Sequence, residues 1–477
     1  MTLARGSVAA VDFGATSGRV MLGRFDGGTL QLEQVARFPN GPVRAADGLH
    51  WDFSGLLAAS RAGLTRSLKR EPRLCSVGVD AWAVDYGLLK NGRMLREPFH
   101  YRDERTTSAV QAAHSVVTPA ELYERNGLQH LPFNTMFQLE ADRASGALSG
   151  ADTMLLIPDL VAHALTGVAV AERTNASTTG LLSVRSGGWD TDLMDRLALP
   201  RSLFPELVDA GAVIGAASEF GGLPVVAVGS HDTASAVLGV PATQPDFAYI
   251  SCGTWGLVGV EVERPILTAA SREANFTNEG GVDGRVRYLH NVMGLWLLSE
   301  SVRQWERGSA AIELGRLLAE AAAVRADVPI FDADDPVFLT PGDMPARIEA
   351  WFVERGEQPP HGRAELTRSI IESLAETFAR TVRLAGELSS RAVSVIHLVG
   401  GGSQNELLCQ STADRSGLPV LAGPVEATAI GNMLVQGRTV GLLDASDVDG
   451  LRAAVARSFE PRTYRPRSRQ AASRSDR

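Results

Sequence analysis

The stretch VAAVDFGATSGRVMLGRF (residues 8–25) predicts two β-strands joined by a turn of small residues. Val8–Phe13 is largely apolar, and Arg19–Phe25 alternates between polar and apolar residues. Between them, Gly14 and Ser17-Gly18 supply the small residues that a tight hairpin turn requires. The stretch therefore predicts a β-hairpin that carries an acidic side chain, Asp12, at the end of its first strand.

The segments that follow place this hairpin in an α/β domain. Leu30–Phe38 alternates again and predicts a third strand, and Asp52 stands as the N-cap of an amphipathic helix. Leu74–Val79 predicts a further strand. Three strands, a helix and another strand indicate antiparallel pairing at the start of the domain, which is not a pure Rossmann order. From about residue 95 to 220 the pattern is mostly helical.

A similar pattern restarts after a linker at residues 239–247. Phe247–Ser251 and Gly256–Val262 predict two strands around a tight turn, Arg363–Leu388 predicts a long amphipathic helix, and Val393–Val399 predicts a buried strand. The chain of 477 residues also exceeds what one hydrophobic core usually fills. We therefore predict two domains, residues 1–242 and 243–465, and a disordered Arg/Ser-rich tail at 466–477.

Composition excludes several classes of protein. The formal net charge is −9 and no long basic run precedes the tail, which argues against nucleic acid or an anionic membrane as the main partner. The three cysteines are too far apart for a disulfide framework or a CxxC metal site. No stretch of about 20 apolar residues predicts a membrane span, and the residues before Asp12 do not contain an apolar run of the length that predicts a signal peptide. We expect a cytoplasmic protein, monomeric or homodimeric.

Two turns of small residues are candidates for holding phosphate. In Asp12–Arg19, backbone N–H groups and two hydroxyls can donate to phosphate oxygens, and Asp12 beside them suits Mg²⁺. Ser251–Trp255 is the corresponding turn of the second half. Each segment is also consistent with a plain hairpin turn that binds nothing. Two such turns in corresponding places favour a nucleotide held by both domains.

Three further segments carry polar or glycine-rich chemistry. Gly400-Gly401-Gly402 leaves room for a flat adenine or ribose, or is only a strand-to-helix turn. Asp232, in Ser230–Thr233, is a general base for a sugar hydroxyl or only a helix N-cap. Asp80–Tyr86 combines carboxylates with aromatic rings, as sugar sites do, or is an exposed turn with a core Trp.

Taken together, nine segments in order resemble the FGGY carbohydrate kinases of the actin/Hsp70-like ATPase superfamily. They are AVDFGATSGRVML (10–22), DAWAVDYGLL (80–89), YRDERT (101–106), SHDTASAV (230–237), SCGTWGLVG (251–259), NFTNEGG (275–281), NVMGLWLL (291–298), VGGGSQNELLCQ (399–410) and AGPVEATAIGN (422–432). The resemblance implies two ribonuclease-H-like (actin-like ATPase) domains with a nucleotide- and sugar-binding cleft between them.

The resemblance also implies a role for each matching position. The residues expected at ATP are Asp12, Ala15, Thr16, Ser17, Gly18, Arg19, Thr254, Ser299, Gly401 and Gly402, with Asp12 also at Mg²⁺. The residues expected at the sugar are Ala83, His231, Asp232, Thr233 and Asn291, with Asp232 as the catalytic base. Two positions depart from the pattern: Ala83 stands where Gly is frequent, and Ser299 stands where Gln is expected.

The activity implied by the resemblance is transfer of the ATP γ-phosphoryl group to the 1-hydroxyl of a ketose. L-Rhamnulose is the expected acceptor, as a step of L-rhamnose breakdown. Ala83 leaves other ketoses, such as L-fuculose or xylulose, as alternatives. A non-kinase protein of the same superfamily, in which ATP drives a conformational switch, is the alternative of a different class.

Overall fold

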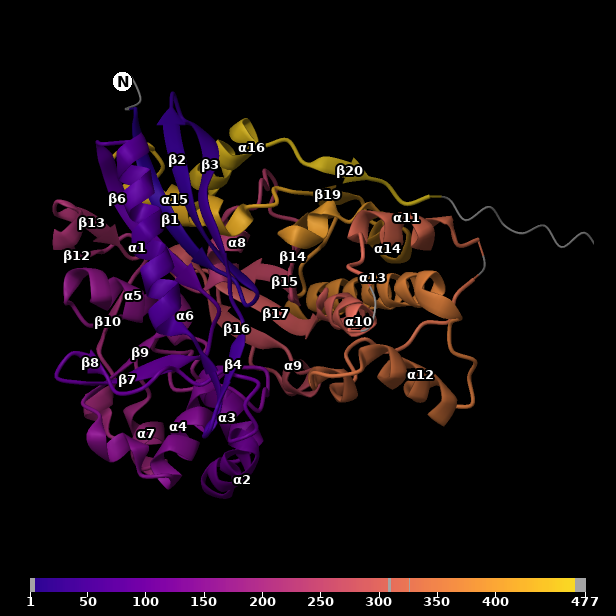
Figure 1. Cartoon of the computed structure of the whole chain (residues 1–477), viewed down its shortest axis with the longest axis horizontal. Helices are drawn as coiled ribbons and strands as arrows, with labels where there is room; N and C mark the ends of the chain where they lie inside the picture. Colours follow the sequence, from indigo (N-terminus) through magenta and orange to yellow (C-terminus); the bar gives the residue numbers. More distant parts are fainter. Residues whose placement is uncertain (1–4, 308–309, 326, 468–477) are drawn as a thin grey trace, which may run out of the picture. The chain divides into compact units, whose positions relative to one another are not determined.

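The computed structural model describes residues 5–307, 310–325 and 327–467. Two compact units divide the chain (Figure 1). The first contains the chain up to Thr243, Val260–His290 and Glu426–Glu460, and the second contains Gln244–Gly259, Asn291–Val425 and the chain from Pro461. The division predicted after residue 242 stays a prediction, because these units are defined by packing and the chain returns twice to the first. Most of the tail predicted at 466–477 lies outside the described residues.

The main sheet of the first unit has six strands, and it confirms the predicted antiparallel start. Its order is β12 (Val213–Ala217), β13 (Leu223–Val226), β6 (Leu74–Ala81), β1 (Gly6–Phe13), β2 (Ser17–Asp26) and β3 (Thr29–Pro39). β1 pairs antiparallel with β2 and parallel with β6, so the hairpin of residues 8–25 supplies two neighbouring strands of the six. β13 is parallel to β6, so the C-terminal end of β13 lies at the same edge of the sheet as Phe13 and Ala81, the last residues of β1 and β6.

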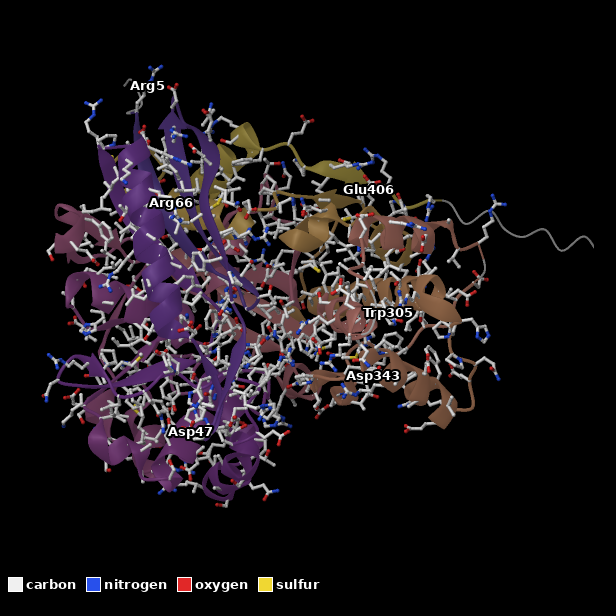
Figure 2. All side chains as sticks on the ribbon, in the orientation of Figure 1. Arg5, Asp47, Arg66, Trp305, Asp343 and Glu406 are labelled. Atoms are coloured by element: carbon white, nitrogen blue, oxygen red, sulfur yellow. The ribbon has the colours of Figure 1, made fainter. Side chains whose placement is uncertain are left out.

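Helices cover both faces of this sheet (Figure 1). α1 (Phe53–Arg70) begins at Asp52, which accepts a hydrogen bond from the Gly55 N–H at 2.9 Å, as the sequence predicts. Its Gly63 lies so close to the sheet that a Cβ there would be 2.4 Å from the Val20 side chain. Arg66, by contrast, is exposed on the outer side of α1 (Figure 2).

The opposite face is covered by α15 (Ala427–Thr439), which comes from the far end of the sequence. A Cβ at Gly23 of β2 would be 2.4 Å from the Met433 sulfur, and Gly23 and Val20 point to opposite faces because side chains alternate along a strand. Val8, Ala10, Ile430 and Leu434 are among the fully buried residues of this interface. This packing is why residues 426–460 belong to the first unit.

The remaining parts of the first unit are smaller. Three-stranded and two-stranded sheets contain β8 (Arg93–Met94), β7 (Tyr86–Lys90), β9 (Thr153–Leu156), β4 (Pro42–Ala45), β5 (Gly48–Trp51), β10 (Val170–Glu172) and β11 (Glu206–Val208). The helices are α2 (Thr106–Val116), α3 (Pro119–Asn126), α4 (Thr135–Ala144), α5 (Ile157–Thr166), α6 (Arg173–Ala176), α7 (Thr191–Arg196), α8 (Asp232–Leu238), α9 (Ala269–Glu273) and α16 (Val448–Ser458). β16 (Thr277–Gly280) pairs antiparallel with the first half of β17 (Val286–Met293).

In the second unit, five strands run in the order β15 (Trp255–Val262), β14 (Phe247–Cys252), β18 (Val395–Val399), β19 (Val420–Ala422) and β20 (Arg462–Tyr464). The predicted hairpin is confirmed, because β14 pairs antiparallel with β15, and β14 pairs parallel with β18. The helices are α10 (Trp296–Glu306), α11 (Leu314–Ala323), α12 (Met344–Glu354), α13 (Gly362–Ser389) and α14 (Glu406–Ser416). Across the described ranges, no helix combines the length and apolar character of a membrane span.

Candidate active site

Three carboxylates gather where neighbouring strands of the first unit end. Asp12 of β1 and Asp80 of β6 are direct partners in the parallel register. The Ala81 N–H donates to the Ser230 carbonyl at 2.9 Å, so the segment after β13 continues the ladder and delivers Asp232 beside them. The pKa of Asp12 is raised by burial, opposed by Arg19, and raised further by Asp232. The strand order therefore brings together side chains that lie far apart in the sequence.

Asp12 and Asp80 are almost completely buried, with 2% and 0% of their surface exposed. Burial raises the pKa of Asp12 to about 6, although its Oδ2 lies 3.1 Å from Nε of Arg19. Arg19 also pairs with Glu426. Asp80 Oδ2 accepts a hydrogen bond from Nδ2 of Asn432 at 2.6 Å, and burial holds the pKa of Asp80 well above its usual range. Two adjacent buried carboxylates favour either a shared proton or a cation.

The turn that follows Asp12 is compact. The Gly14 N–H donates to the Ser17 carbonyl at 3.0 Å, and the Asn40 side chain donates to the Gly14 carbonyl at 2.8 Å. Thr16 is exposed, and Ala15 and Ser17 are half-buried. Gly18 is buried, and a Cβ there would be 2.2 Å from the Phe38 ring. The glycine at position 18 is therefore required by packing, whatever the turn binds.

Asp232 differs from the other two carboxylates because 28% of its side chain is exposed. It begins α8, and its Oδ1 accepts a hydrogen bond from the Thr233 hydroxyl at 3.1 Å and lies 3.4 Å from Nε2 of His231. Burial raises the pKa of Asp232, and the neighbouring His231 opposes that shift. An accessible carboxylate in a largely buried environment is what a general base requires.

Glu172 fixes the backbone on which Asp232 stands. This buried carboxylate accepts hydrogen bonds from the Ser230 N–H at 3.0 Å, the Ser230 hydroxyl at 2.8 Å and the Thr174 hydroxyl at 2.5 Å. The His231 N–H lies 3.3 Å from the same Thr174 hydroxyl. The sequence contained no pattern that singles out Glu172, because its contacts form only after the chain folds.

The segment Asp80–Tyr86 is not an exposed turn, and that alternative is wrong for its two carboxylates. Asp85 is fully buried and accepts hydrogen bonds from side-chain N–H groups of Trp51 (2.6 Å), Trp82 (3.0 Å) and Gln138 (2.8 Å), and from the Tyr101 N–H (3.2 Å). Its acceptor positions are therefore occupied by protein donors. Half-buried Ala83 lies within this rigid loop, in which Val84 has a φ of 67°.

The second unit brings its own candidate residues to the ends of β14 and β18. Ser251 pairs with Val399, so the turn at Thr254 and the Gly400–Gly402 segment lie at the same edge. A Cβ at Gly402 would be 2.5 Å from the Cys252 sulfur, whereas a Cβ at Gly401 would meet nothing within 4 Å. Of the two glycines, Gly402 is needed for packing and Gly401 faces open space.

The remaining candidates of the second unit lie near the start of α10. The Thr254 carbonyl accepts hydrogen bonds from the Gly294 and Trp296 N–H groups, both at 3.2 Å. Ser299 is exposed in the first turn of α10, and Asn291 is half-buried in β17. Thr254, Ser299, Gly401 and Gly402 all belong to this unit.

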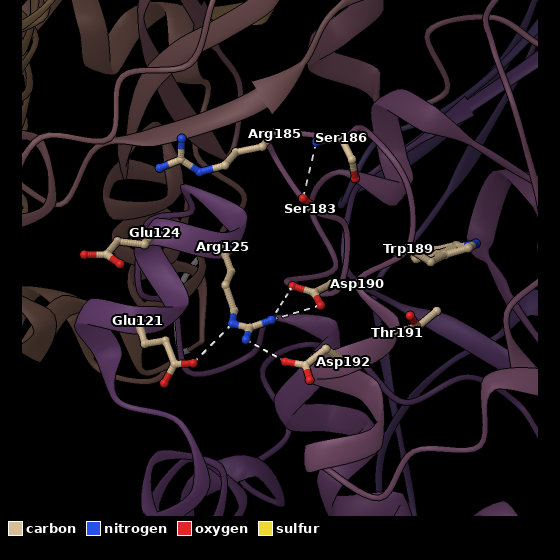
Figure 3. Close-up of a pocket in the computed structure, with 10 residues that line it drawn as sticks. All are labelled: Glu121, Glu124, Arg125, Ser183, Arg185, Ser186, Trp189, Asp190, Thr191 and Asp192. Atoms are coloured by element: carbon tan, nitrogen blue, oxygen red, sulfur yellow. Dashed lines mark hydrogen bonds and ion pairs between the residues drawn. The ribbon is translucent and has the colours of Figure 1, made fainter.

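A separate cavity of about 550 Å³ opens between α3 and residues 183–192 of the first unit (Figure 3). Arg125 there is paired with Glu121, Asp190 and Asp192, so its guanidinium is already occupied (Figure 3). None of the residues that line this cavity belongs to the cluster of Asp12, Asp80 and Asp232. Among the residues that the structure describes, no group of three or more His, Cys, Asp or Glu side chains has the arrangement of a metal site.

Comparison with known proteins identifies relatives along nearly the whole chain. Residues 8–239 match the N-terminal domain of the FGGY family of carbohydrate kinases, and residues 248–440 match its C-terminal domain. The rhamnulokinases of Bacteroides thetaiotaomicron and Klebsiella pneumoniae are each 40% identical to this chain. The alignment with the Bacteroides protein spans 96% of this chain and 95% of the relative, and the alignment with the Klebsiella protein spans 96% of this chain and 94% of the relative. The solved xylulose kinase from Lactobacillus acidophilus has a TM-score of 0.77 at 16% identity, covering 97% of this chain and 94% of that chain, which shows the fold.

Proposed function

Because this chain belongs to the FGGY family of carbohydrate kinases, we propose that it phosphorylates L-rhamnulose at the 1-hydroxyl group. The products are L-rhamnulose 1-phosphate and ADP, in a step of L-rhamnose breakdown that takes place in the cytoplasm. The observation that carries the choice of sugar is the 40% identity to rhamnulokinases over almost the full length of both chains. L-Fuculose and xylulose are the competing acceptors, because Ala83 departs from the expected Gly.

Asp232 is the base in this reaction. As the bond between the sugar oxygen and the γ-phosphorus forms and the bond from that phosphorus to the β-phosphate oxygen breaks, the hydroxyl proton passes to the Asp232 carboxylate. Its partial exposure and its fixed position at the start of α8 support this role. His231, Thr233, Ala83 and Asn291 contact the sugar.

The nucleotide is held by backbone-rich segments in each unit. In the first unit, Ala15–Arg19 bind the phosphates, and Arg19 supplies positive charge. In the second unit, Thr254 binds phosphate, Gly401 and Gly402 lie at the adenosine, and Ser299 contributes a shorter contact than Gln would.

Asp12 suits Mg²⁺ bound together with ATP. Mg²⁺ in such sites takes one or two carboxylates, and phosphate oxygens and water complete its shell, so a cluster of three protein ligands is not needed. Asp12 Oδ2 is ion-paired with Arg19 at 3.1 Å, whereas Asp80 Oδ1 beside it is buried without a hydrogen-bond partner, which fits a nearby cation. When bound, the ion neutralises phosphate charge.

The base assignment is tested with Asp232→Asn. We expect this variant to bind ketose and ATP with near-normal affinity and to lose about 10³-fold in kcat, because an amide cannot accept the proton. Asp190→Asn is the matched control, since Asp190 is a partly buried helix-capping carboxylate of the Figure 3 cavity, and its kcat should stay near wild type. A near-normal kcat in Asp232→Asn contradicts the assignment.

The choice of acceptor is tested with a panel of ketoses and coupled detection of ADP. The highest kcat/KM should be on L-rhamnulose, and a higher value on L-fuculose or xylulose would replace it as the substrate. ATP hydrolysis that does not depend on any sugar would instead favour a switch protein.

A further inference from the structure

The segment NFTNEGG (275–281) contributes a buried glutamate, Glu279, that contacts His231 of the proposed sugar site. Oε2 of Glu279, on β16, lies 3.3 Å from Nδ1 of His231 and 3.1 Å from Nη2 of Arg287, on β17. Arg287 is fully buried, and Glu279 and His231 are 6% and 5% exposed. Arg287 Nη2 itself lies 3.0 Å from Nδ1 of His231, within hydrogen-bond distance. The three side chains form one buried cluster.

The chemistry of the guanidinium decides how the imidazole is protonated. Arginine stays charged and only donates hydrogen bonds, so in its contact with His231 the Nδ1 atom must be the acceptor. An imidazole whose Nδ1 accepts is neutral and carries its proton on Nε2. In the competing arrangement, Nδ1–H of His231 donates to Glu279. An Arg287 N–H would then point at a protonated nitrogen. The contact between Nδ1 and Glu279, at 3.3 Å, is also longer than the contact between Nδ1 and Arg287, at 3.0 Å.

The other side of the ring faces the reaction. Nε2 of His231 lies 3.4 Å from Oδ1 of Asp232, the oxygen that also accepts the Thr233 hydroxyl hydrogen bond. A proton on Nε2 makes this nitrogen a donor beside the base, whereas a proton on Nδ1 would make it an acceptor facing a carboxylate. An N–H donor at Nε2 of His231 can hold a sugar hydroxyl oxygen next to the Asp232 carboxylate, which removes the hydroxyl proton.

We propose that Arg287, held by Glu279, fixes His231 as the neutral imidazole with its proton on Nε2, so that His231 presents an N–H donor to the ketose. Arg287 and Glu279 are positioning residues in this arrangement, and they contribute to sugar selection without touching the sugar. The consequence for the ketose rests on the function proposed above, whereas the protonation of His231 does not.

Nitrogen-15 NMR of the wild-type chain labelled at histidine tests the protonation directly. Nine histidines contribute signals, and the His231 pair is identified by its loss in His231→Gln. At pH 7 we expect Nδ1 to show the shift of an unprotonated nitrogen and Nε2 that of a protonated one. A proton on Nδ1, or on both nitrogens, overturns the proposal. This measurement gives the same answer whether or not the protein phosphorylates a ketose.

The role of Arg287 is tested with Arg287→Lys. The lysine side chain is one bond shorter and keeps the charge opposite Glu279, but it lacks the Nη2 donor that reaches Nδ1. We expect the His231 proton to move to Nδ1, and the KM for the ketose to rise about tenfold, the effect of losing one well-placed hydrogen bond, with the KM for ATP unchanged.

Arg125→Lys is the matched control. Arg125 is a half-buried arginine of the first unit that is ion-paired with Glu121, Asp190 and Asp192, and these partners line the cavity of Figure 3 and do not belong to α8. Arg125→Lys should lose stability while the His231 signals and the ketose KM stay at wild-type values. Wild-type His231 signals in Arg287→Lys, or an equal rise in KM in both variants, refute the proposal. If the wild-type enzyme turns over no ketose, the function fails but the NMR result still stands.

Discussion

Substituting Gly431 by alanine tests whether the packing of two helices sets the position of the catalytic base. Gly431 on α15 faces α8 so closely that a Cβ would be 1.9 Å from the Ser235 carbonyl oxygen. The approach is reciprocal, because a Cβ at Gly239, the C-cap of α8, would be 2.2 Å from the Ala427 carbonyl oxygen. Both obstructing atoms belong to backbone, so a change of rotamer cannot relieve the overlap.

The size of the effect follows from these distances. Moving the new methyl group from 1.9 Å to the ordinary contact distance of 3.4 Å requires a displacement of about 1.5 Å between α8 and α15. Overpacking of this kind costs about 1–3 kcal/mol, and the better helix propensity of alanine returns about 1 kcal/mol. Because α8 has only seven residues and begins at Asp232, a shift at Ser235 moves the base as well. A misplacement of about 1 Å can lower kcat about 100-fold.

The assay compares kcat for the ketose with the free energy of unfolding in urea. Gly437→Ala is the control on the same helix, since its Cβ would be 2.6 Å from the Phe25 ring, a side chain on the sheet side. Both variants should lose about 0–2 kcal/mol of stability, but only Gly431→Ala should lose about 100-fold in kcat. Equal kcat values in the two variants would show that contact between α8 and α15 does not govern the base.

Four further substitutions address single residues. Gly401→Ala should raise the KM for ATP and leave the melting temperature unchanged. Gly402→Ala should lower the melting temperature, because its Cβ would be 2.5 Å from the Cys252 sulfur. A lower melting temperature in Gly401→Ala and an unchanged one in Gly402→Ala would contradict the structure. Ala83→Gly should change the KM for the ketose and leave that for ATP unaltered, and an effect on ATP alone would remove Ala83 from the sugar site. Burial raises the pKa of Asp85 to about 6, above its value of about 3.9 in the unfolded chain, so its contribution to stability is greatest below pH 4 and is lost as the pH rises through 6. Urea unfolding of the wild type and Asp85→Asn at pH 4.5 and 7 should therefore show the wild type losing stability relative to the variant at the higher pH, and a constant difference would exclude this effect.

Local patterns in the sequence predicted the elements that carry their own signals. The helix at Asp52 begins where its N-cap predicted, and the 363–388 helix is observed as Gly362–Ser389 because its apolar stripe runs its full length. β13 ends at Val226, and beyond it the Ser230 carbonyl accepts a hydrogen bond from the Ala81 N–H, a contact that no local pattern in the sequence predicted. The 95–220 region contains short strands as well as helices. The sequence did not predict these strands, because three to five residues are too few to show a clear alternation of polar and apolar side chains.

The partners of the site residues could not be predicted in the same way. Asn432 reaches Asp80 across 352 positions of the chain, and Glu426 reaches Arg19 across 407. Both stand in the quoted segment AGPVEATAIGN, but nothing in that segment says which strand α15 will cover. Glu279 and Glu172 show the same limit, because a buried carboxylate is recognisable only when its donors are in place.

The segments that identify the family serve binding and packing together, and the structure separates the two. Gly18 is held by the Phe38 ring, Gly402 by the Cys252 sulfur and Gly431 by the Ser235 backbone, so each of these glycines would be required even without a ligand. Gly401 has no such neighbour, and Asp232 keeps part of its carboxylate exposed in a site where Asp12 and Asp80 are buried. A residue that packing does not explain is the better candidate for function, and by that criterion Asp232 and Gly401 are the strongest of the positions that the sequence proposed.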